Sequence, residues 1–286
     1  MVLFKNILLK ELCDSYNEIS KKGAEQWVDS IATQKDIDIF KNEANQVSPF
    51  DKFNLKKQMF NLYETNKATI VCKQISNARI CILTENKNEF YPWNTWCRVF
   101  QWMGDSINIV SVSPKDSSTW QIYIYSSKVK RILPNEGPIG AEHLNGGYTY
   151  PCTSDCIVVY RYEEATRVLI HELLHASCTD NMSNSVEVRE AATEVWAELF
   201  LVVILANGNF NKALLLWNIQ DHYIQDLNYT VRTFHSVLSM NDYGARYTIL
   251  REDILNNFKL YLDKSYKVKR IKTSRFTSPK LDTYLV

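Results

Sequence analysis

The sequence predicts an α+β fold in which a mixed or antiparallel sheet packs on a helix that carries the functional residues. Helical periodicity opens the chain, a block of short strand-like segments follows, and helical periodicity then returns almost to the C-terminus. Because the strand-like segments come as a block and do not alternate with helices, a doubly wound sheet is disfavoured. The 286 residues are 45% hydrophobic, which is enough for a substantial core.

The first predicted region is helical and spans residues 1–66. Apolar residues recur at three- and four-residue steps at its start, which predicts an amphipathic helix that ends near Gly23. We expect further helices around residues 27–40 and 55–64. Charged residues interrupt the apolar pattern of the opening segment, so no signal peptide is expected.

A strand-rich region is predicted over residues 67–162. Its segments are short, rich in β-branched and aromatic residues, and bounded by Asn, Pro, Gly and Ser; they are 69–75, 78–84, 107–112, 119–127 and 156–161. Among these segments lie Trp93, Trp96 and Trp102, which could fill the core or line a pocket. The core is the favoured interpretation.

Residues 163–286 form the third predicted region, which is mostly helical. A helix end is expected at Asn207-Gly208. The apolar run 199–206 is much shorter than the ~20 residues that a membrane span needs, so we expect a buried helix end. The basic segment 267–280 is predicted to be a solvated tail in preference to a binding element.

The charge balance bears on which partners the chain binds, and its cysteine content bears on the cellular compartment in which it folds. The chain has 33 basic and 32 acidic side chains, which disfavours a nucleic-acid-binding protein. Its seven cysteines are odd in number and scattered, so disulfides are not expected and an intracellular, cytoplasmic location is favoured. Cys152 and Cys156 are the only close pair, and a structural zinc site there is the weaker interpretation.

The strongest functional pattern is His-Glu-Leu-Leu-His at residues 171–175. Residues four apart share a helix face, so His171 and His175 can direct two imidazoles at one zinc ion. Glu172 lies one step round the helix and can reach a water molecule as a general base without being a ligand. The chain has only five histidines, which makes a chance match on a core helix the weaker interpretation.

A catalytic zinc ion normally has three protein ligands and one open position. A second predicted helix, 185–205, carries acidic residues at 187, 190, 194 and 198. Glu194 is the favoured third ligand because strongly apolar turns follow it, which predicts burial. Glu187 and Glu190 are its competitors, but they lie nearer the helix start, where acidic residues commonly offset the helix dipole.

Eighteen residues separate His175, the last residue of the motif, from the helical Glu194. This arrangement resembles the gluzincin metallopeptidases, which include thermolysin-like proteases and membrane-alanyl-type aminopeptidases. The resemblance implies a zincin-like fold, zinc ligands at His171, His175 and Glu194, and water activation by Glu172. It also implies a supporting role for Glu198, because thermolysin-like enzymes keep an acidic residue there that hydrogen-bonds a ligating histidine. The Gly-Ala-Met-Glu-Asn signature of the aminopeptidases is absent, so aminopeptidase specificity is not supported.

The segment before the motif supplies candidate substrate-binding residues. In zincin folds, the strand that precedes the active-site helix pairs with the substrate backbone, and strand addition demands no particular sequence. Asn145, Gly146 and Gly147 stand at this position, and glycine lets another chain approach closely. A tight turn before a strand explains the same residues equally well.

The residue that stabilises the oxyanion has no clear match to these families. We favour Tyr247 as a second catalytic residue, from a set of candidates that comprises His222, His235, Tyr243 and Tyr247.

The runs NGGYTY, IVVYRYEEATRVLIHELLHA and EAATEVWAE also resemble zinc peptidases encoded by large DNA viruses. That resemblance would bring Arg161, Glu163 and Glu164 into the site. Otherwise these residues form the solvated N-terminal end of the motif helix, which is the commoner role.

The sequence therefore predicts a zinc-dependent peptidase that acts on a peptide or protein, with no nucleic acid or membrane as partner. In this hypothesis, Glu172 takes a proton from water and passes it to the departing amine. The main alternative is a zincin-fold binding or scaffold protein without turnover. A nucleic-acid-associated processing protease is a further alternative, which the near-zero net charge disfavours.

Overall fold

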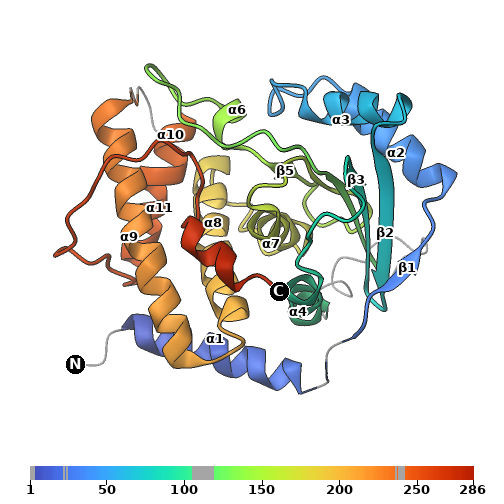
Figure 1. Ribbon diagram of the computed structural model, residues 1–286. Helices are drawn as coiled ribbons and strands as arrows, with labels where there is room; N and C mark the ends of the chain where they lie inside the picture. The colour runs from blue at the N-terminus through green and yellow to red at the C-terminus, as the bar shows by residue number, and fades with distance from the viewer. Residues whose placement is uncertain (1–3, 22, 24, 105–118, 236, 238–241) are drawn as a thin grey trace. The chain divides into compact units, whose positions relative to one another are not determined.

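The computed structural model describes residues 4–21, 23, 25–104, 119–235, 237 and 242–286, and the chain forms two compact units (Figure 1). The helical unit comprises Met1–Lys22, Arg131–Leu144 and Asp180–Leu285. The sheet unit comprises Gly23–Lys130, Asn145–Thr179 and Val286. Each unit gathers segments that are far apart in the sequence, so the units cut across the predicted regions 1–66, 67–162 and 163–286.

The sheet unit contains a mixed sheet with six strands among the described residues, in the order β1-β2-β3-β4-β6-β5. Neighbouring strands are antiparallel except for β3–β4 and β4–β6, which are parallel. The strands are β1 (Val28–Ser30), β2 (Thr69–Ile75), β3 (Ala78–Thr84), β4 (Trp120–Tyr125), β5 (Gly147–Tyr148) and β6 (Ile157–Val159). The chain is thus α+β with a mixed sheet, as predicted, and the predicted strand 107–112 lies outside the described residues.

The prediction of a helix over residues 27–40 is wrong in its first half. Residues Val28–Ser30 form β1, and helix α2 (Gln34–Asn45) begins only after Thr33. Thr33 and Asp36 form a capping box, in which the Asp36 N–H donates to Thr33 Oγ1 at 3.3 Å and the Thr33 N–H donates to Asp36 Oδ2 at 2.6 Å. These reciprocal bonds satisfy backbone donors that a helix leaves open at its N-terminus, and they determine where α2 starts.

Helices cover both faces of the sheet in this unit (Figure 1). α2 and α3 (Leu55–Glu64) pack on one face, and α4 (Trp93–Met103) and α7 (Ala165–Ala176) lie on the other. Trp96 is fully buried and donates from Nε1 to Thr166 Oγ1 at 2.9 Å, which ties α4 to α7. Trp96 therefore belongs to the core, whereas Trp93 and Trp102 are half-buried.

The helical unit is organised around α8 (Val186–Leu205). Helices α1 (Phe4–Ser20) and α9 (Phe210–Phe234) contact α8, and so do a π-helical turn, η2 (Arg246–Leu250), and helix α11 (Arg251–Asn257). The short elements of this unit are α6 (Ala141–Leu144), α10 (Tyr243–Ala245) and the 3-10 helix η3 (Pro279–Tyr284).

The connection between α8 and α9 is the predicted helix end. Gly208 has a φ of +69°, and its N–H donates to Val203 O at 3.1 Å. Glycine adopts this left-handed conformation without the steric cost that other residues meet. Among the described residues, no helix is long and apolar enough to cross a membrane.

The prediction of a solvated tail over residues 267–280 is wrong for its second half. The backbone and side chains of Ser274–Ser278 are buried. Gln220 Nε2 of α9 donates to Phe276 O at 2.8 Å, and Tyr223 Oη donates to Arg275 O at 3.2 Å. Polar side chains of α9 therefore replace water as the partners of this segment, which a local charge pattern does not predict.

Candidate functional site

Helix α7 carries the His-Glu-Leu-Leu-His motif inside the sheet unit. All twelve of its residues are buried, and the helix contacts both β5 and β6. His171 Nε2 and His175 Nε2 are 3.1 Å apart. The two imidazoles of the motif therefore converge on one point, as the four-residue spacing predicts.

The distance between these nitrogens suits a shared metal ion. Two imidazole ligands at Zn–N distances of 2.0–2.1 Å in a tetrahedral site have their nitrogens about 3.3 Å apart. His171 and His175 are 6% and 8% exposed, so the packing of α7 holds both rings. The donor set of α7 thus fits zinc at two of its ligand positions.

Gly147 of β5 lies directly against α7 beside Glu172. A Cβ atom at Gly147 would lie 3.3 Å from Glu172 Cγ, 2.6 Å from Val168 Cγ1 and 2.7 Å from Val158 O. Only glycine allows the strand to approach the helix this closely. Since β5 is the last strand of the sheet among the described residues, an edge of the described sheet lies next to the proposed general base.

Arg161 supports the segment that leads into β5. This side chain is 1% exposed, and its Nε donates to Asn145 O at 2.9 Å. Its Nη1 reaches Val129 O and Lys130 O, each at 3.3 Å. The Tyr160 N–H donates to Gly146 O at 2.7 Å. The carbonyl groups of Asn145 and Gly146 are therefore held by residues at the end of β6.

The two acidic residues before α7 have local roles in the structure. Glu164 is the N-cap residue of α7 and has a φ of +61°. Glu163 Oε1 lies 3.6 Å from Lys130 Nζ. Both lie at the start of the helix, but Glu164 is 8% exposed and the Glu163 side chain 10%, so the expectation that this end is solvated is wrong.

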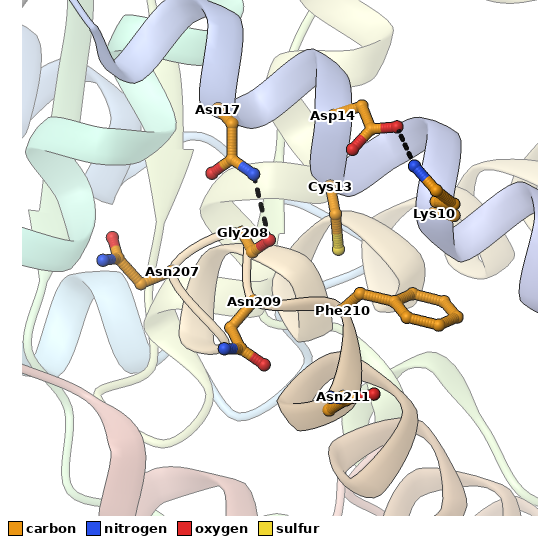
Figure 2. A pocket seen from close by; sticks show the side chains of 9 residues that line it. All are labelled: Lys10, Cys13, Asp14, Asn17, Asn207, Gly208, Asn209, Phe210 and Asn211. Atoms are coloured by element: carbon orange, nitrogen blue, oxygen red, sulfur yellow. Dashed lines mark hydrogen bonds and ion pairs between the residues drawn. The ribbon is translucent and has the colours of Figure 1, made fainter.

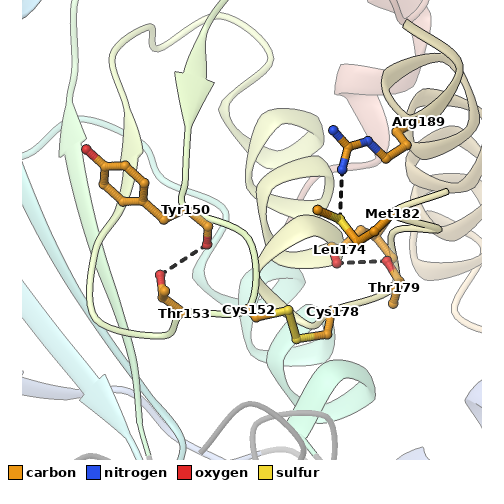
Figure 3. The surroundings of a disulfide bond; sticks show 8 residues. All are labelled: Tyr150, Cys152, Thr153, Leu174, Cys178, Thr179, Met182 and Arg189. Carbon is orange, nitrogen blue, oxygen red and sulfur yellow. Dashed lines mark hydrogen bonds between the residues drawn. A yellow bond between two sulfur atoms is a disulfide. The ribbon is translucent and has the colours of Figure 1, made fainter. Parts of the chain in front are cut away.

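A disulfide between Cys152 and Cys178 closes the C-terminal end of α7 (Figure 3). The expectation of a chain without disulfides is therefore wrong, and Cys156 remains a free thiol. The N–H groups of Cys152 and Cys178 both donate to His175 O, at 3.1 and 3.2 Å. Twenty-six positions separate the two cysteines, and no local spacing signal relates them.

In the helical unit, α8 presents a row of acidic residues. Positions three and four apart share a helix face, which aligns these residues in one stripe: Glu187, Glu190, Glu194 and Glu198. Glu194 and Glu198 are 1% and 0% exposed, so the burial predicted for Glu194 is observed. Glu187, near the helix start, pairs with Arg246 at 3.3 Å.

Glu198 is paired with Arg251, a residue for which the sequence suggests no role. Arg251 Nη1 donates to Glu198 Oε1 at 2.7 Å, and its Nη2 donates to Asn228 Oδ1 at 3.3 Å. Both side chains of the ion pair are 0% exposed. Arg251 follows Tyr247 by four residues, and this spacing is the signal that could have placed both on the surface that faces α8.

Tyr247 lies on the π-helical turn and contacts the acidic stripe. Its Oη donates to Glu190 Oε2 at 3.1 Å. Burial, together with the negative charges of Glu190 and Glu194, raises the pKa of Tyr247 well above its usual value. The phenol therefore stays protonated and can act as a hydrogen-bond donor. Single π-helical turns frequently occur at functional sites.

The other oxyanion candidates have different surroundings. His222 stacks on Tyr266 with ring centroids 4.0 Å apart, and its Nε2 lies 3.5 Å from Asp263 Oδ2. His235 Nδ1 lies 3.3 Å from Gly137 O. Tyr243 packs on Tyr247 with ring centroids 6.0 Å apart.

The predicted site residues are thus divided between the units. His171, Glu172, His175 and the segment 145–147 belong to the sheet unit, and Glu194, Glu198 and Tyr247 belong to the helical unit.

An open hollow of about 490 Å³ also lies in the helical unit, between α1 and the α8–α9 connection (Figure 2). Asn17 Nδ2 donates to Gly208 O across it at 3.1 Å, and Lys10 pairs with Asp14 at 2.6 Å. Burial raises the pKa of the Cys13 thiol in its wall to about 11, so this thiol is not an activated nucleophile. None of the predicted site residues lines this hollow.

Comparison with protein-family models, with curated proteins and with solved structures finds no match to this chain.

Proposed function

We propose that the chain is a zinc-dependent peptidase whose active site is built on α7. The observation that carries the proposal is the 3.1 Å separation of His171 Nε2 and His175 Nε2 on a fully buried helix, with Glu172 beside them. Two convergent imidazoles and an adjacent carboxylate are the donor set and the base that metal-assisted hydrolysis needs.

In this proposal His171, His175 and Glu194 hold the zinc ion. Glu194 is proposed as the third ligand from the gluzincin spacing and its deep burial, and Glu190 on the same face of α8 is the alternative. When bound, zinc polarises a scissile carbonyl and lowers the pKa of water. Glu172 accepts the proton of that water and delivers it to the departing amine.

Tyr247 is proposed to stabilise the oxyanion that forms on the scissile carbonyl. A donor for this role must keep its proton at working pH, and the raised pKa of Tyr247 satisfies that requirement. Its hydrogen bond to Glu190 orients the phenol in the absence of substrate.

The edge formed by Asn145, Gly146 and Gly147 is proposed to bind the substrate backbone. In the part of the chain that the structure describes, β5 is the terminal strand of the sheet, and its Gly147 lies against Glu172. A peptide paired with such an edge receives backbone hydrogen bonds that do not depend on its sequence. This supports a peptide or an unfolded protein segment as substrate.

The first test is the metal content of purified variants. We expect the wild-type chain to hold one equivalent of zinc after dialysis, and His171→Ala and His175→Ala to hold none. Glu194→Gln should lose zinc, whereas Glu190→Gln should retain it. The reverse result for the two glutamate variants would move the third ligand to Glu190, and retention of zinc by both histidine variants would overturn the proposed metal site.

The second test is hydrolysis of a mixed peptide library, with products identified by mass spectrometry. Glu172→Gln should bind zinc normally and reduce cleavage by about a hundredfold or more, since it removes the general base. Zinc-loaded wild-type protein that cleaves nothing in the library would favour the scaffold alternative. Equal cleavage by wild type and Glu172→Gln would show that the proposed mechanism is wrong.

A further inference from the structure

Cys72 and Cys81 face each other across the antiparallel strands β2 and β3 of the sheet unit. The two strands are joined by a two-residue turn after the pair Ile75–Ala78. In a hairpin with a two-residue turn, the residue pair that closes the turn is hydrogen-bonded. Hydrogen-bonded and non-hydrogen-bonded pairs then alternate along the two strands, so Cys72–Cys81, the third pair beyond Ile75–Ala78, is a non-hydrogen-bonded pair. The Cα atoms of these pairs lie about 4.5 Å apart, which is within the range that a disulfide spans.

The two thiols lie close together in the core. Their sulfur atoms lie within 4.8 Å of each other and of a carboxylate oxygen of Asp36. The cysteines are 3% and 1% exposed and belong to the cluster that packs under α2, with Phe40 and Tyr123.

Asp36 does not turn this pair into a metal site, because its oxygens already accept hydrogen bonds. Oδ1 accepts from Arg79 Nη1 at 2.6 Å and from Tyr123 Oη at 3.3 Å. Oδ2 accepts from Arg79 Nη2 at 2.9 Å and from the N–H and Oγ1 of Thr33, both at 2.6 Å. A cation bound to Asp36 would also lie next to the Arg79 guanidinium.

We propose that Cys72 and Cys81 form a peroxide-reactive dithiol that oxidises to a disulfide between β2 and β3. The inference goes beyond the proposed peptidase function and uses none of its residues. In the first step, a thiolate sulfur attacks hydrogen peroxide, an S–O bond forms as the O–O bond breaks, and hydroxide leaves. In the second step, the other sulfur attacks the sulfenic sulfur, an S–S bond forms as the S–O bond breaks, and the displaced hydroxide takes the proton of the attacking thiol and leaves as water.

The surroundings assign different roles to the two sulfurs. A hydrogen bond from Cys81 lowers the pKa of Cys72, even though burial opposes ionisation. The same contact and burial raise the pKa of Cys81. We assign the attack on peroxide to Cys72 and the resolving step to Cys81, and the two serine variants below test this assignment. Hydrogen peroxide is a small neutral molecule, so local opening of the sheet unit is enough to admit it.

The positions of Lys73 and Arg79 make the product easy to identify. Trypsin cleaves after Lys67, Lys73, Arg79 and Lys87, which leaves one cysteine in the peptide 68–73 and one in 80–87. Full-length protein is treated with hydrogen peroxide, denatured in an alkylating agent and digested. We expect a disulfide-linked pair of these peptides that disappears when a reducing agent is added before digestion.

Cys97 is the matched control, because it is as buried as Cys81 and its sulfur donates to Glu25 O at 3.2 Å. The linked peptides should form at least about tenfold faster than any oxidised form of the Cys97 peptide, since a neighbouring thiol resolves the sulfenic acid. Cys72→Ser should leave Cys81 as unreactive as Cys97, and Cys81→Ser should trap Cys72 as a sulfenic acid.

Three results would overturn the proposal. The first is oxidation of Cys72 and Cys81 no faster than that of Cys97 in the wild-type protein. The second is conversion of either cysteine to a sulfinic acid with no linked peptide. The third is release of a bound metal ion as the two thiols oxidise, which would assign the pair to a metal site. All three are measured on the wild-type chain, so they do not depend on the folding of any variant.

Discussion

Arg251 donates a 2.7 Å hydrogen bond to Glu198, and neither side chain is exposed to solvent. A buried carboxylate without its partner is left as an uncompensated charge, and the same holds for a buried guanidinium. This ion pair links α11 to the centre of α8, four residues beyond the proposed zinc ligand Glu194. Removal of either partner should therefore destabilise the helical unit.

Arg251→Met is expected to lower the free energy of unfolding by about 3–5 kcal/mol, because it leaves Glu198 buried and charged. Glu198→Gln should have a similar effect, and the double variant should be more stable than either single one. Urea unfolding of chelator-treated protein measures this without any contribution from zinc. Asp14→Asn, which removes the exposed Lys10–Asp14 pair, is the control and should leave the free energy of unfolding close to that of the wild type. Equal, small effects of all the variants would contradict the prediction.

Gly147→Ala is expected to impair both stability and cleavage. The added methyl group would lie 2.6 Å from Val168 Cγ1 and 2.7 Å from Val158 O, so β5 must move away from α7. Overpacking of this kind costs about 1–3 kcal/mol. The displacement also disturbs Glu172, and hydrolysis of the peptide library should fall while zinc content stays unchanged.

Gly244→Ala is the matched control for Gly147→Ala. Its new methyl group would meet its nearest neighbour, Val231 Cγ1, at 3.4 Å, so stability and cleavage should be close to those of the wild type. Normal cleavage by Gly147→Ala would show that the edge at β5 is not part of the site.

Reduction of the Cys152–Cys178 disulfide is expected to loosen the end of α7. The bridge closes a loop across 26 positions, for which the chain-entropy model gives a stabilisation of about 3.5 kcal/mol. Cys178→Ser should therefore lower the midpoint of urea unfolding under non-reducing conditions. Hydrogen exchange of the Cys152 and Cys178 amides, which both donate to His175 O, should become faster.

The control for the disulfide is Cys156→Ser, which replaces a free and half-buried thiol. Its unfolding midpoint should stay near that of the wild type and should still fall on addition of a reducing agent. A wild-type midpoint that does not respond to reduction would contradict a stabilising role for the bridge.

Asp36 is expected to contribute to stability in a defined acid range. Burial alone would raise the pKa of its carboxyl, but hydrogen bonds from Arg79 and Thr33 outweigh burial and lower it to about 2. The unfolded chain has an aspartate pKa of about 3.9, so the contribution is fully present above pH 4 and is lost as the pH falls through about 2. Its size is about 2.5 kcal/mol.

Urea unfolding between pH 5 and pH 2 tests this prediction. Asp36→Asn should be less stable than the wild type at pH 5, and the difference should shrink as the pH falls. Asp38→Asn, which alters an exposed residue of the same helix, is the control and should follow the wild-type profile. A constant difference between Asp36→Asn and wild type across the range would exclude titration of Asp36 as the cause.

Local patterns in the sequence determined most elements of the fold. The strands β2, β3, β4 and β6 follow from short runs of β-branched and aromatic residues, and the end of α8 follows from Asn207-Gly208. The convergence of His171 and His175 follows from helix geometry alone, because residues four apart share a face. These features depend on neighbouring residues in the chain, which is why a single sequence is sufficient to predict them.

The tertiary structure decided which distant residues meet. It paired Cys152 with Cys178 and Glu198 with Arg251, and it buried the segment 274–278 against α9. It also turned Val28–Ser30 into a strand, because β2 offered an edge to pair with. Such contacts depend on the path of the whole chain. Residue type and spacing predicted two candidate ligands and a candidate base on one helix, but the partners of the buried charges and of the disulfide cysteines come from segments that no local period connects.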